Sequence, residues 1–150
     1  MRVLVTGANG FLGKHTVARL RERGHRVRAM VRPAARLDRL GWTDDVEVYR
    51  ADLRVHRELS SAFEGIDALM HLAACVSGDE DVQFQSSVIG TERLLDAMSR
   101  TAVRRIVFAS SIVVYDWSQA CGEVSVDDPL DQEIYARDGY DVAKLWQEQV

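Results

Sequence analysis

Short apolar runs alternate along the chain with longer stretches in which apolar residues recur every three or four positions. The short runs predict strands at 2–6, 26–31, 46–51, 67–73 and 105–111. The longer stretches predict helices at 11–24, 56–65, 83–101 and 140–150, with a shorter helix at 36–41. In the first predicted helix the apolar positions are Phe11, Leu12, Val17 and Leu20.

Strands that alternate with helices predict parallel pairing and right-handed crossovers. The expected fold class is therefore α/β, with a doubly wound parallel sheet of the Rossmann type and helices on both of its faces. The expected strand order is 3-2-1-4-5. In such sheets ligands bind at the carboxyl ends of the strands, here near the switch point between strands 1 and 4.

Composition narrows the classes of protein that fit this pattern. The chain has 150 residues, of which 47% are hydrophobic and 28% charged, and a net charge of −4 that gives no sign of a nucleic-acid surface. No apolar run approaches the length of a membrane span, and the first residues do not resemble a signal peptide. With only two cysteines, a reduced cytoplasmic location is expected, and none of the four histidines is predicted to bind a metal.

Residues 5–13 read VTGANGFLG and place three glycines directly after the first predicted strand. A helix that begins there presents unpaired backbone N–H groups and the positive end of its dipole, so a pyrophosphate can dock. Gly7 is expected to permit the tight turn, Gly10 to let the phosphates approach, and Gly13 to let the helix pack closely on the sheet. The simpler alternative is a turn that merely needs glycine.

These glycines and four later motifs resemble the extended branch of the short-chain dehydrogenase/reductase superfamily, which includes the NAD-dependent epimerases and dehydratases and the dihydroflavonol-type reductases. The later motifs are ADL at 51–53, HLAA at 71–74, FASSIVVYD at 108–116 and YDVAK at 140–144. The resemblance covers essentially the whole chain. It implies cofactor contacts from the following residues: Gly7, Asn9, Gly10, Phe11, Leu12, Gly13, Arg32, Asp52, Leu53, Leu72, Ala73, Ala74, Tyr140 and Lys144.

Tyr140 and Lys144 are the predicted acid–base pair, with Ser111 as their partner. Four residues of helix place the pair on one face, about 6 Å apart along the axis. A nearby ammonium favours phenolate and lowers the tyrosine pKa, so the phenol can act as general acid or base. Ser111 is expected to hydrogen-bond the substrate oxygen. The alternative is that all three residues have only structural roles.

Neighbouring candidates fit the family pattern less well. Ser111 is preferred to Ser110 because the catalytic serine of the family lies four residues before the tyrosine of the VY pair, here Tyr115. Neither Tyr115 nor Tyr135 is followed by a lysine four residues later. Ser87 stands where many relatives have asparagine, so the role of that asparagine does not carry over. Cys75 is predicted to be a buried thiol, and Asp127–Pro129 is predicted to form a loop near the opening of the substrate site.

The end of the second predicted strand bears on the choice of nicotinamide cofactor. An acidic residue there would accept hydrogen bonds from the ribose 2′-OH and repel a 2′-phosphate. Val31 occupies that place and Arg32 follows it, with Arg36 close behind. An arginine can hold a 2′-phosphate through charge-assisted hydrogen bonds. The preferred cofactor is therefore NADP, with NAD as the alternative, and a solvated surface role for Arg32 also remains open.

The resemblance implies an oxidoreductase that moves a hydride between nicotinamide and a carbonyl or hydroxyl carbon of a small molecule. The alternatives are an epimerase or dehydratase that works through transient oxidation, and a non-catalytic NADP-binding sensor. Residues 1–150 are expected to form one NAD(P)-binding domain that ends within the Tyr-x-x-x-Lys helix, without the substrate-binding C-terminal part of the family. Its helices at 88–101 and 140–150 resemble those that pair in family homodimers. Neither nucleic acid nor a membrane is an expected partner.

Overall fold

The structure is a computed structural model that describes residues 1–42, 45–119, 122–132 and 137–150. It divides into two compact units. The first, here called the sheet unit, comprises Met1–Ala74 and Arg93–Ala109, and the second, the helical unit, comprises Cys75–Glu92 and Ser110–Val150. Within the described residues, no helix is long and apolar enough to cross a bilayer.

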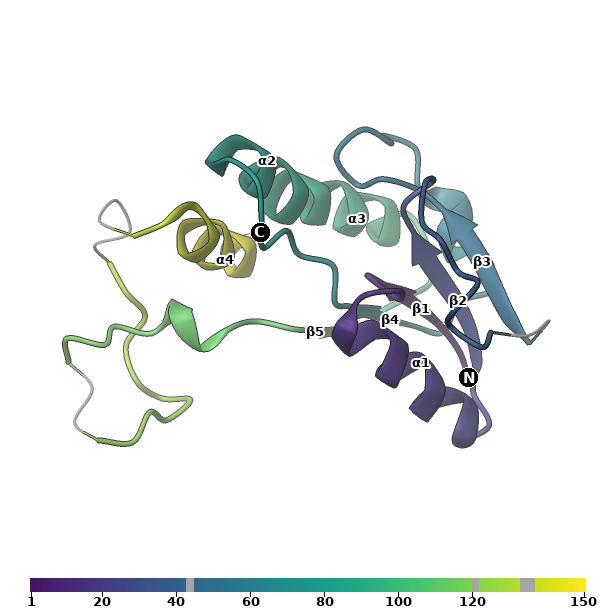
Figure 1. Ribbon diagram of the computed structural model, residues 1–150, viewed down its shortest axis with the longest axis horizontal. Helices are drawn as coiled ribbons and strands as arrows, with labels where there is room; N and C mark the ends of the chain where they lie inside the picture. The colour runs from purple at the N-terminus through teal and green to yellow at the C-terminus, as the bar shows by residue number, and fades with distance from the viewer. Residues whose placement is uncertain (43–44, 120–121, 133–136) are drawn as a thin grey trace. The chain divides into compact units, whose positions relative to one another are not determined.

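Five parallel strands form the sheet, in the order β3-β2-β1-β4-β5 (Figure 1). The strands are β1 (Arg2–Thr6), β2 (Arg26–Val31), β3 (Val46–Arg50), β4 (Ala68–His71) and β5 (Ile106–Phe108). In the centre of the sheet, Val3 of β1 aligns with Val27 of β2 and with Ala68 of β4. The predicted fold class and strand order are therefore confirmed, and all five predicted strands are present, although those predicted at 67–73 and 105–111 are shorter than expected.

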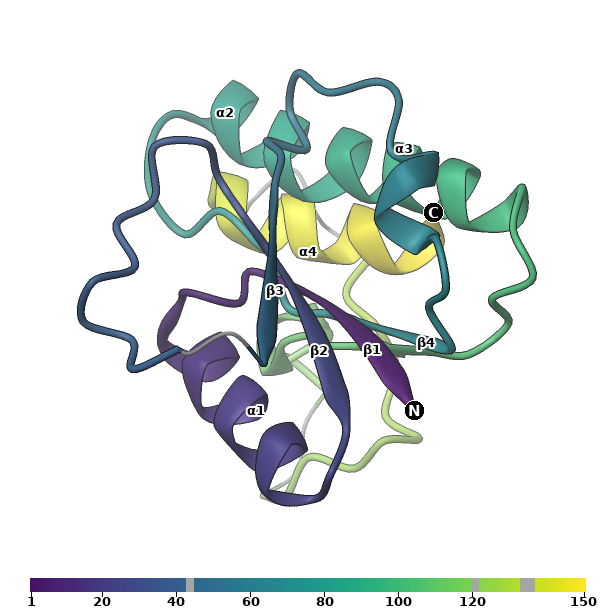
Figure 2. The same ribbon diagram turned by 90° about the vertical axis from the view of Figure 1, so that its right-hand side faces the viewer.

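Alternate residues of the strands build a separate core on each face of the sheet. On one face Val3 and Val5 pack with Val17 of α1 (Phe11–Glu22). On the other face Leu4 and Leu69 join a cluster with Leu94 of α3 (Gly90–Ser99) and with the 3-10 helix η1 (Ser60–Phe63). Figure 2 shows α1 on one side of the sheet and α3 on the other. Because both faces are covered at the centre of the sheet, residues 3–6 of β1 are buried on both sides.

Two of the predicted helices are wrong or too long. Residues 36–41 form no helix, because the chain there makes a turn that Leu40 closes on the Leu37 carbonyl and then enters Gly41 at a φ of +61°. The predicted helix at 56–65 shrinks to η1, since the Asp52 carbonyl already holds the amides of Val55 and His56 in a preceding turn.

The first helix does not bury all the apolar residues that the spacing marked. Val17 is fully buried, but the side chains of Phe11 and Leu12 are 81% and 54% exposed. Both lie in the first turn of α1, directly after the glycine-rich loop. Their exposure leaves two apolar side chains at the predicted cofactor edge of the sheet.

The helical unit is built around the packing of α2 (Glu80–Phe84) against α4 (Gly139–Gln149), which lie side by side in Figure 1. The π-helical turn η2 (Gln85–Ile89) follows α2 directly and leads into α3. A Cβ atom at Gly139 would lie 2.6 Å from Glu80 Cγ and 2.8 Å from Gln83 Oε1. Glycine at this position therefore lets the first turn of α4 touch α2.

Candidate cofactor-binding and active site

The loop between β1 and α1 turns sharply at Gly7, whose φ of +64° suits a residue without a side chain. The Gly10 amide closes the turn by donating to the Gly7 carbonyl at 2.9 Å. A Cβ atom at Gly7 would also lie 2.9 Å from backbone atoms of Ala73, so the loop lies directly against the segment that follows β4. Asn9 and Gly10 are exposed at the tip of this loop.

Gly13 has a different neighbour from the one that the sequence predicts. A Cβ atom there would lie 2.1 Å from the Gly7 carbonyl oxygen and 2.7 Å from Ala8 Cα. The close approach is therefore between the first turn of α1 and the loop itself, rather than between the helix and the sheet. The helix begins at Gly10 without a side-chain cap and has no acidic residue in its first turn, which favours an anion at this end.

Thr6 and His71 join the carboxyl ends of β1 and β4, a pairing that no motif of the sequence predicts. Both are fully buried, and Thr6 Oγ1 lies 2.6 Å from His71 Nδ1. The same oxygen accepts hydrogen bonds from the amides of Leu72 and Ala73, each at 3.2 Å. The hydroxyl thus fixes the HLAA segment beside the glycine loop. The only signal in the sequence was a polar residue at each strand end.

Arg32 and Asp52 follow β2 and β3, which are neighbours in the sheet. Arg32 is exposed, whereas Val31 before it is buried. Arg50 of β3 donates hydrogen bonds to the carbonyls of Pro33 and Ala35, at 2.7 and 3.2 Å. These bonds shape the loop that Arg32 begins. Arg36, the second predicted cation, lies 3.5 Å from the Asp38 carboxylate.

Asp52 is held by an arginine of its own loop. Arg54 binds both carboxylate oxygens, with Nη2 at 2.6 Å and Nε at 3.0 Å from the nearer oxygen in each case. This bidentate pair lowers the pKa of Asp52, and the positive charge of Arg32 acts in the same direction. Asp52 is therefore ionised at neutral pH. Leu53, the next predicted contact, is buried in the core beneath it.

The predicted serine, tyrosine and lysine all lie in the helical unit. Ser111 precedes the 3-10 helix η3 (Ile112–Val114), and its Oγ accepts a long hydrogen bond of 3.5 Å from the Val113 amide. Because the hydroxyl accepts this bond, its own proton is not used in it. The neighbouring Ser110 hydrogen-bonds the Glu148 carboxylate of α4 instead.

Tyr140 lies in the first turn of α4, where Asp138 caps the helix. The Asp138 carboxylate accepts hydrogen bonds from the amides of Tyr140 and Asp141, at 2.9 and 3.1 Å. This cap fixes the backbone of the predicted acid, and the sequence carries its signal in an aspartate two residues before the tyrosine. Tyr115, the rejected candidate, instead forms an antiparallel bridge with Leu130.

Lys144 is buried one helical turn after Tyr140, with only 3% of its surface exposed. Its Nζ donates a hydrogen bond to Gln147 Oε1 at 3.0 Å. Burial lowers the pKa of Lys144 to about 8, although the Glu148 carboxylate opposes the shift. An amine with such a pKa gains and loses its proton close to neutral pH.

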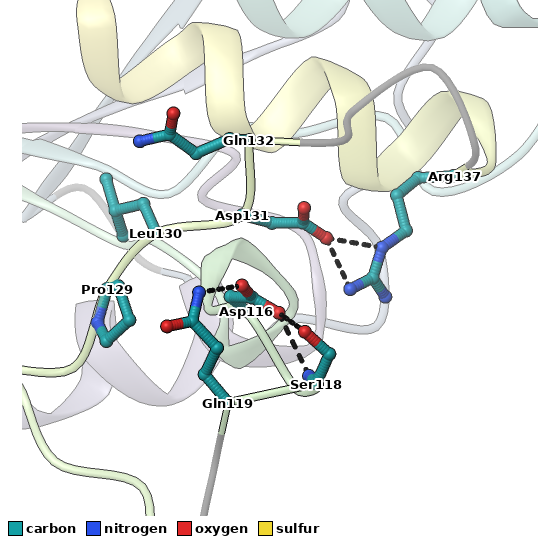
Figure 3. Close-up of a pocket in the computed structure, with 8 residues that line it drawn as sticks. All are labelled: Asp116, Ser118, Gln119, Pro129, Leu130, Asp131, Gln132 and Arg137. Carbon is teal, nitrogen blue, oxygen red and sulfur yellow. Dashed lines mark hydrogen bonds and ion pairs between the residues drawn. The ribbon is translucent and has the colours of Figure 1, made fainter.

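A hollow of about 500 Å³ opens in the helical unit (Figure 3). The residues that line it all precede α4 in the sequence. Asp131 and Arg137 form an ion pair in its wall, and the Asp116 carboxylate accepts hydrogen bonds from Ser118 and Gln119. Of the acidic turn at 127–129, only Pro129 lines the hollow.

Asp128 and Cys75, for which the sequence predicts structural roles, both lie in described parts of the chain. Asp128 closes its own turn by accepting from the Ser125 amide at 2.8 Å. Cys75 is half-buried, and its Sγ lies 3.0 Å from the Ser77 carbonyl oxygen. Tyr135 and Cys121 lie outside the described residues.

Comparison with known proteins gives a consistent result over almost the whole chain. The model of the NAD dependent epimerase/dehydratase family matches residues 3–150. A sterol demethylase protein B of Methylococcus capsulatus is 42% identical over 116 residues, which cover 74% of this chain and 34% of that protein. A UDP-glucose 4-epimerase of Halalkalibacterium halodurans is 35% identical over 122 residues, which cover 77% of this chain and 36% of that protein.

A crystal structure of a short-chain dehydrogenase/reductase superfamily protein from Agrobacterium tumefaciens, with bound NAD, has a similar fold. The TM-score is 0.81 and the sequence identity 37%, over 99% of this chain and 43% of that one. The chain thus spans well under half the length of these relatives.

Proposed function

The chain belongs to the NAD dependent epimerase/dehydratase family, and on this premise we propose that it carries the cofactor-binding and acid–base residues of an NAD(P)-dependent oxidoreductase. The proposal rests on one observation. Lys144 is buried one helical turn after Tyr140, at the start of α4, whose N-terminus Asp138 caps. The substrate class is a small molecule with a carbonyl or hydroxyl carbon. When bound, the nicotinamide supplies or accepts the hydride.

The loop after β1 is suited to a dinucleotide because glycines at positions 7 and 13 let it pack tightly against backbone, while Gly10 is exposed at its tip without a side chain. A Cβ atom at Gly7 or Gly13 would meet backbone within 3 Å, and α1 begins without a side-chain cap. Its first amides are therefore suited to a pyrophosphate. Phe11 and Leu12 are exposed beside that position and would contact the cofactor. The remaining contacts would come from Asn9, Gly10, Asp52, Leu53, Leu72, Ala73 and Ala74.

Tyr140 would hold and move the proton at the reacting oxygen. A phenol with an ordinary pKa near 10 exchanges its proton poorly at neutral pH. The ammonium form of Lys144, one turn away, favours the phenolate and so brings that proton within reach. Lys144 would also hold the cofactor ribose. The Ser111 hydroxyl would donate its proton in a hydrogen bond to the same substrate oxygen as negative charge develops there.

NADP is the preferred cofactor in this proposal because no acidic residue ends β2. The buried Val31 occupies the strand end, and the exposed Arg32 follows on a loop that Arg50 shapes. A guanidinium at this place can bind a 2′-phosphate by charge-assisted hydrogen bonds. Arg36 would assist from the same loop.

An epimerase or dehydratase that oxidises its substrate only transiently is the second candidate, and similarity to the Halalkalibacterium halodurans UDP-glucose 4-epimerase favours it. Both candidates need the same tyrosine, lysine and serine. A cofactor-binding sensor without chemistry would not need them. The proposal also includes a homodimer formed through α3 and α4, and a cytoplasmic location.

Replacement of Tyr140 by phenylalanine tests the proposal, because it keeps the ring and removes only the hydroxyl. In the complete protein, Tyr140→Phe should lower the single-turnover rate of hydride transfer by about 10²–10⁴-fold, with little change in cofactor affinity. NADPH absorbance follows the reaction with carbonyl substrates, and UDP-glucose with NAD tests the epimerase alternative.

Tyr115→Phe is the matched control, since it removes a hydroxyl from a tyrosine of the helical unit that no lysine follows four residues later. It should leave the rate nearly unchanged. A near wild-type rate for Tyr140→Phe would show that another group is the acid, even with the fold correct.

A further inference from the structure

A buried chain of hydrogen bonds connects Lys144 to the π-helical turn η2. Lys144 Nζ donates to Gln147 Oε1 at 3.0 Å, and Gln147 Nε2 donates to Thr91 Oγ1 at 2.8 Å. The Thr91 hydroxyl in turn donates to the Ser87 carbonyl. All four residues are at most 3% exposed. Buried polar groups of this kind are costly unless each is satisfied.

The Ser87 carbonyl determines which group donates in each hydrogen bond between Ser87, Thr91, Gln147 and Lys144. The Ser87 carbonyl can only accept, so it takes the single proton of the Thr91 hydroxyl. The Thr91 oxygen can then only accept from its other side, and the amide nitrogen of Gln147 must face it. The amide oxygen of Gln147 is thereby turned toward Lys144.

The Ser87 carbonyl, where this series of hydrogen bonds begins, lies in the π-helical turn η2. In η2 the backbone bonds run from residue i to i+5 rather than to i+4. Thr91 reaches back four residues with its side chain to the Ser87 carbonyl within this turn. Turns of this kind occur often at functional sites. The Ser87 hydroxyl in turn accepts from the Cys75 amide at 3.3 Å.

We propose that Gln147 and Thr91 are positioning residues that hold the amine of Lys144, a role that rests on the proposed function of Lys144 in cofactor binding and acid–base chemistry. Gln147 accepts a hydrogen bond from the amine without adding charge, so it can hold both the ammonium and the neutral form. Thr91 does not touch Lys144 and acts by keeping the Gln147 amide in one orientation.

Charged groups also lie on α4 and on the elements packed against it. Glu148 is the neighbour whose charge raises the pKa of Lys144 against the effect of burial. Asp141 lies on the same helix, with its own pKa raised by burial and by Asp138. On the packed side, α2 contributes Glu80 beside Gly139, together with Asp81, whereas η2 and η3 contain no charged residue.

Lys144 can be observed directly because Lys14 is the only other lysine of the chain. In protein labelled with ¹³C-lysine, the Cε signals of the two residues are titrated by NMR without cofactor. Lys14 is exposed on α1 and serves as the internal reference. Gln149→Met, an exposed position on the same helix, is the control substitution.

Substitutions at the two positions should move the Lys144 titration in opposite directions. Gln147→Glu adds a negative charge at hydrogen-bond distance and should raise the pKa by more than one pH unit. Thr91→Val releases the Gln147 amide to turn its nitrogen toward the amine, so the pKa should fall by at least half a unit. Thr91→Ser keeps the hydroxyl and should titrate like the wild type. If Thr91→Val does not fold, Thr91→Ala removes the hydroxyl with a smaller side chain and tests its role in the same way.

The titration and cofactor affinity separate this proposal from the function on which it rests. If the Lys144 titration is the same in Gln147→Glu, Thr91→Val and wild type, the positioning role is wrong. If the titration moves as expected while NADPH affinity, measured by calorimetry, stays unchanged in every variant, the positioning role stands and the cofactor role of Lys144 fails.

Discussion

Lys144 keeps its amine in a place where burial penalises the charged form. Its pKa is about 8 in the fold, against 10.5 for an ordinary lysine. The unfolded chain therefore binds more protons than the folded one between pH 8 and 10.5, and stability should rise with pH across that interval. Below pH 8 the full penalty is present. A buried lysine with a lowered pKa is better suited to acid–base chemistry than to stabilising the fold.

This penalty gives a prediction for Lys144→Met, which keeps the aliphatic stem and removes the amine. The free energy of unfolding of wild type, relative to Lys144→Met, should increase by roughly 2–3 kcal/mol between pH 7.5 and 10.5. Urea unfolding at several pH values measures the difference. Lys14→Met, at an exposed lysine, should show no such dependence. A flat difference for Lys144→Met would mean that the amine keeps its ordinary pKa.

Thr6 contributes to the stability of the fold through its single hydroxyl group. Its hydroxyl oxygen accepts from two backbone amides after β4 and is hydrogen-bonded to His71 Nδ1. Thr6→Val keeps the shape but leaves these groups without their partner, and should cost about 2 kcal/mol or more in unfolding free energy. Thr6→Ser should restore most of it. Thr16→Val on α1 is the control and should change stability by less than about 0.5 kcal/mol. A small effect of Thr6→Val would show that the HLAA segment is held by other contacts.

At the scale of elements, Gly10 and Gly13 in the loop after β1 differ in how much space a side chain would have. A Cβ atom at Gly13 would lie 2.1 Å from the Gly7 carbonyl oxygen, and backbone cannot move aside cheaply. A Cβ atom at Gly10 would meet the same oxygen at 3.2 Å, which a small adjustment relieves. The fold therefore needs glycine at position 13, whereas at position 10 we predict that glycine serves the proposed cofactor rather than the fold.

Gly13→Ala should consequently destabilise the chain by at least about 2 kcal/mol, because it forces α1 away from the loop. Gly10→Ala should unfold at nearly the wild-type denaturant concentration, yet bind NADPH at least tenfold more weakly. Urea unfolding and calorimetry measure the two effects. Equal loss of stability in both variants would contradict the division.

The elements that the sequence predicted correctly are those whose signal is local. The apolar runs and the helical spacing located β1 to β5, α1 and α4, and the alternation of strands with helices predicted the sheet order. The helix at 36–41 was wrong because Gly41 adopts a positive φ there. The π-helical turn η2 was not predicted, since hydrophobic spacing does not register one additional residue in a helical turn.

The candidate site shows the same division. Motifs located the glycines, Tyr140 and Lys144, because their spacing along the chain carries the chemistry. The contacts between Thr6 and His71, and between Thr91 and Gln147, join residues more than fifty positions apart. Such pairs depend on how strands and helices meet, and a single sequence carries no record of that.

At the scale of the whole molecule, the net charge of −4 does not favour an anionic cofactor. Attraction for a dinucleotide must therefore be local, from the start of α1 and from Arg32 after β2. Local charge pairs at an exposed position weaken as salt screens them. The affinity for NADPH should accordingly fall with ionic strength more steeply than the affinity for NADH, which lacks the 2′-phosphate.

Cofactor binding should also stabilise the folded chain, because a ligand that binds only the folded state shifts unfolding by mass action. At a free concentration one hundred times its Kd, NADPH should add about 2.7 kcal/mol and raise the midpoint of thermal unfolding by several degrees. Arg32→Ala should reduce the shift with NADPH far more than the shift with NADH, at equal concentrations, since a lost charge-assisted hydrogen bond costs about 1.5–3 kcal/mol. Arg23→Ala makes the same change of charge at the C-terminal end of α1 and should leave both shifts intact. Equal loss for the two cofactors in Arg32→Ala would mean that Arg32 does not bind the 2′-phosphate, and NAD would then be the better assignment.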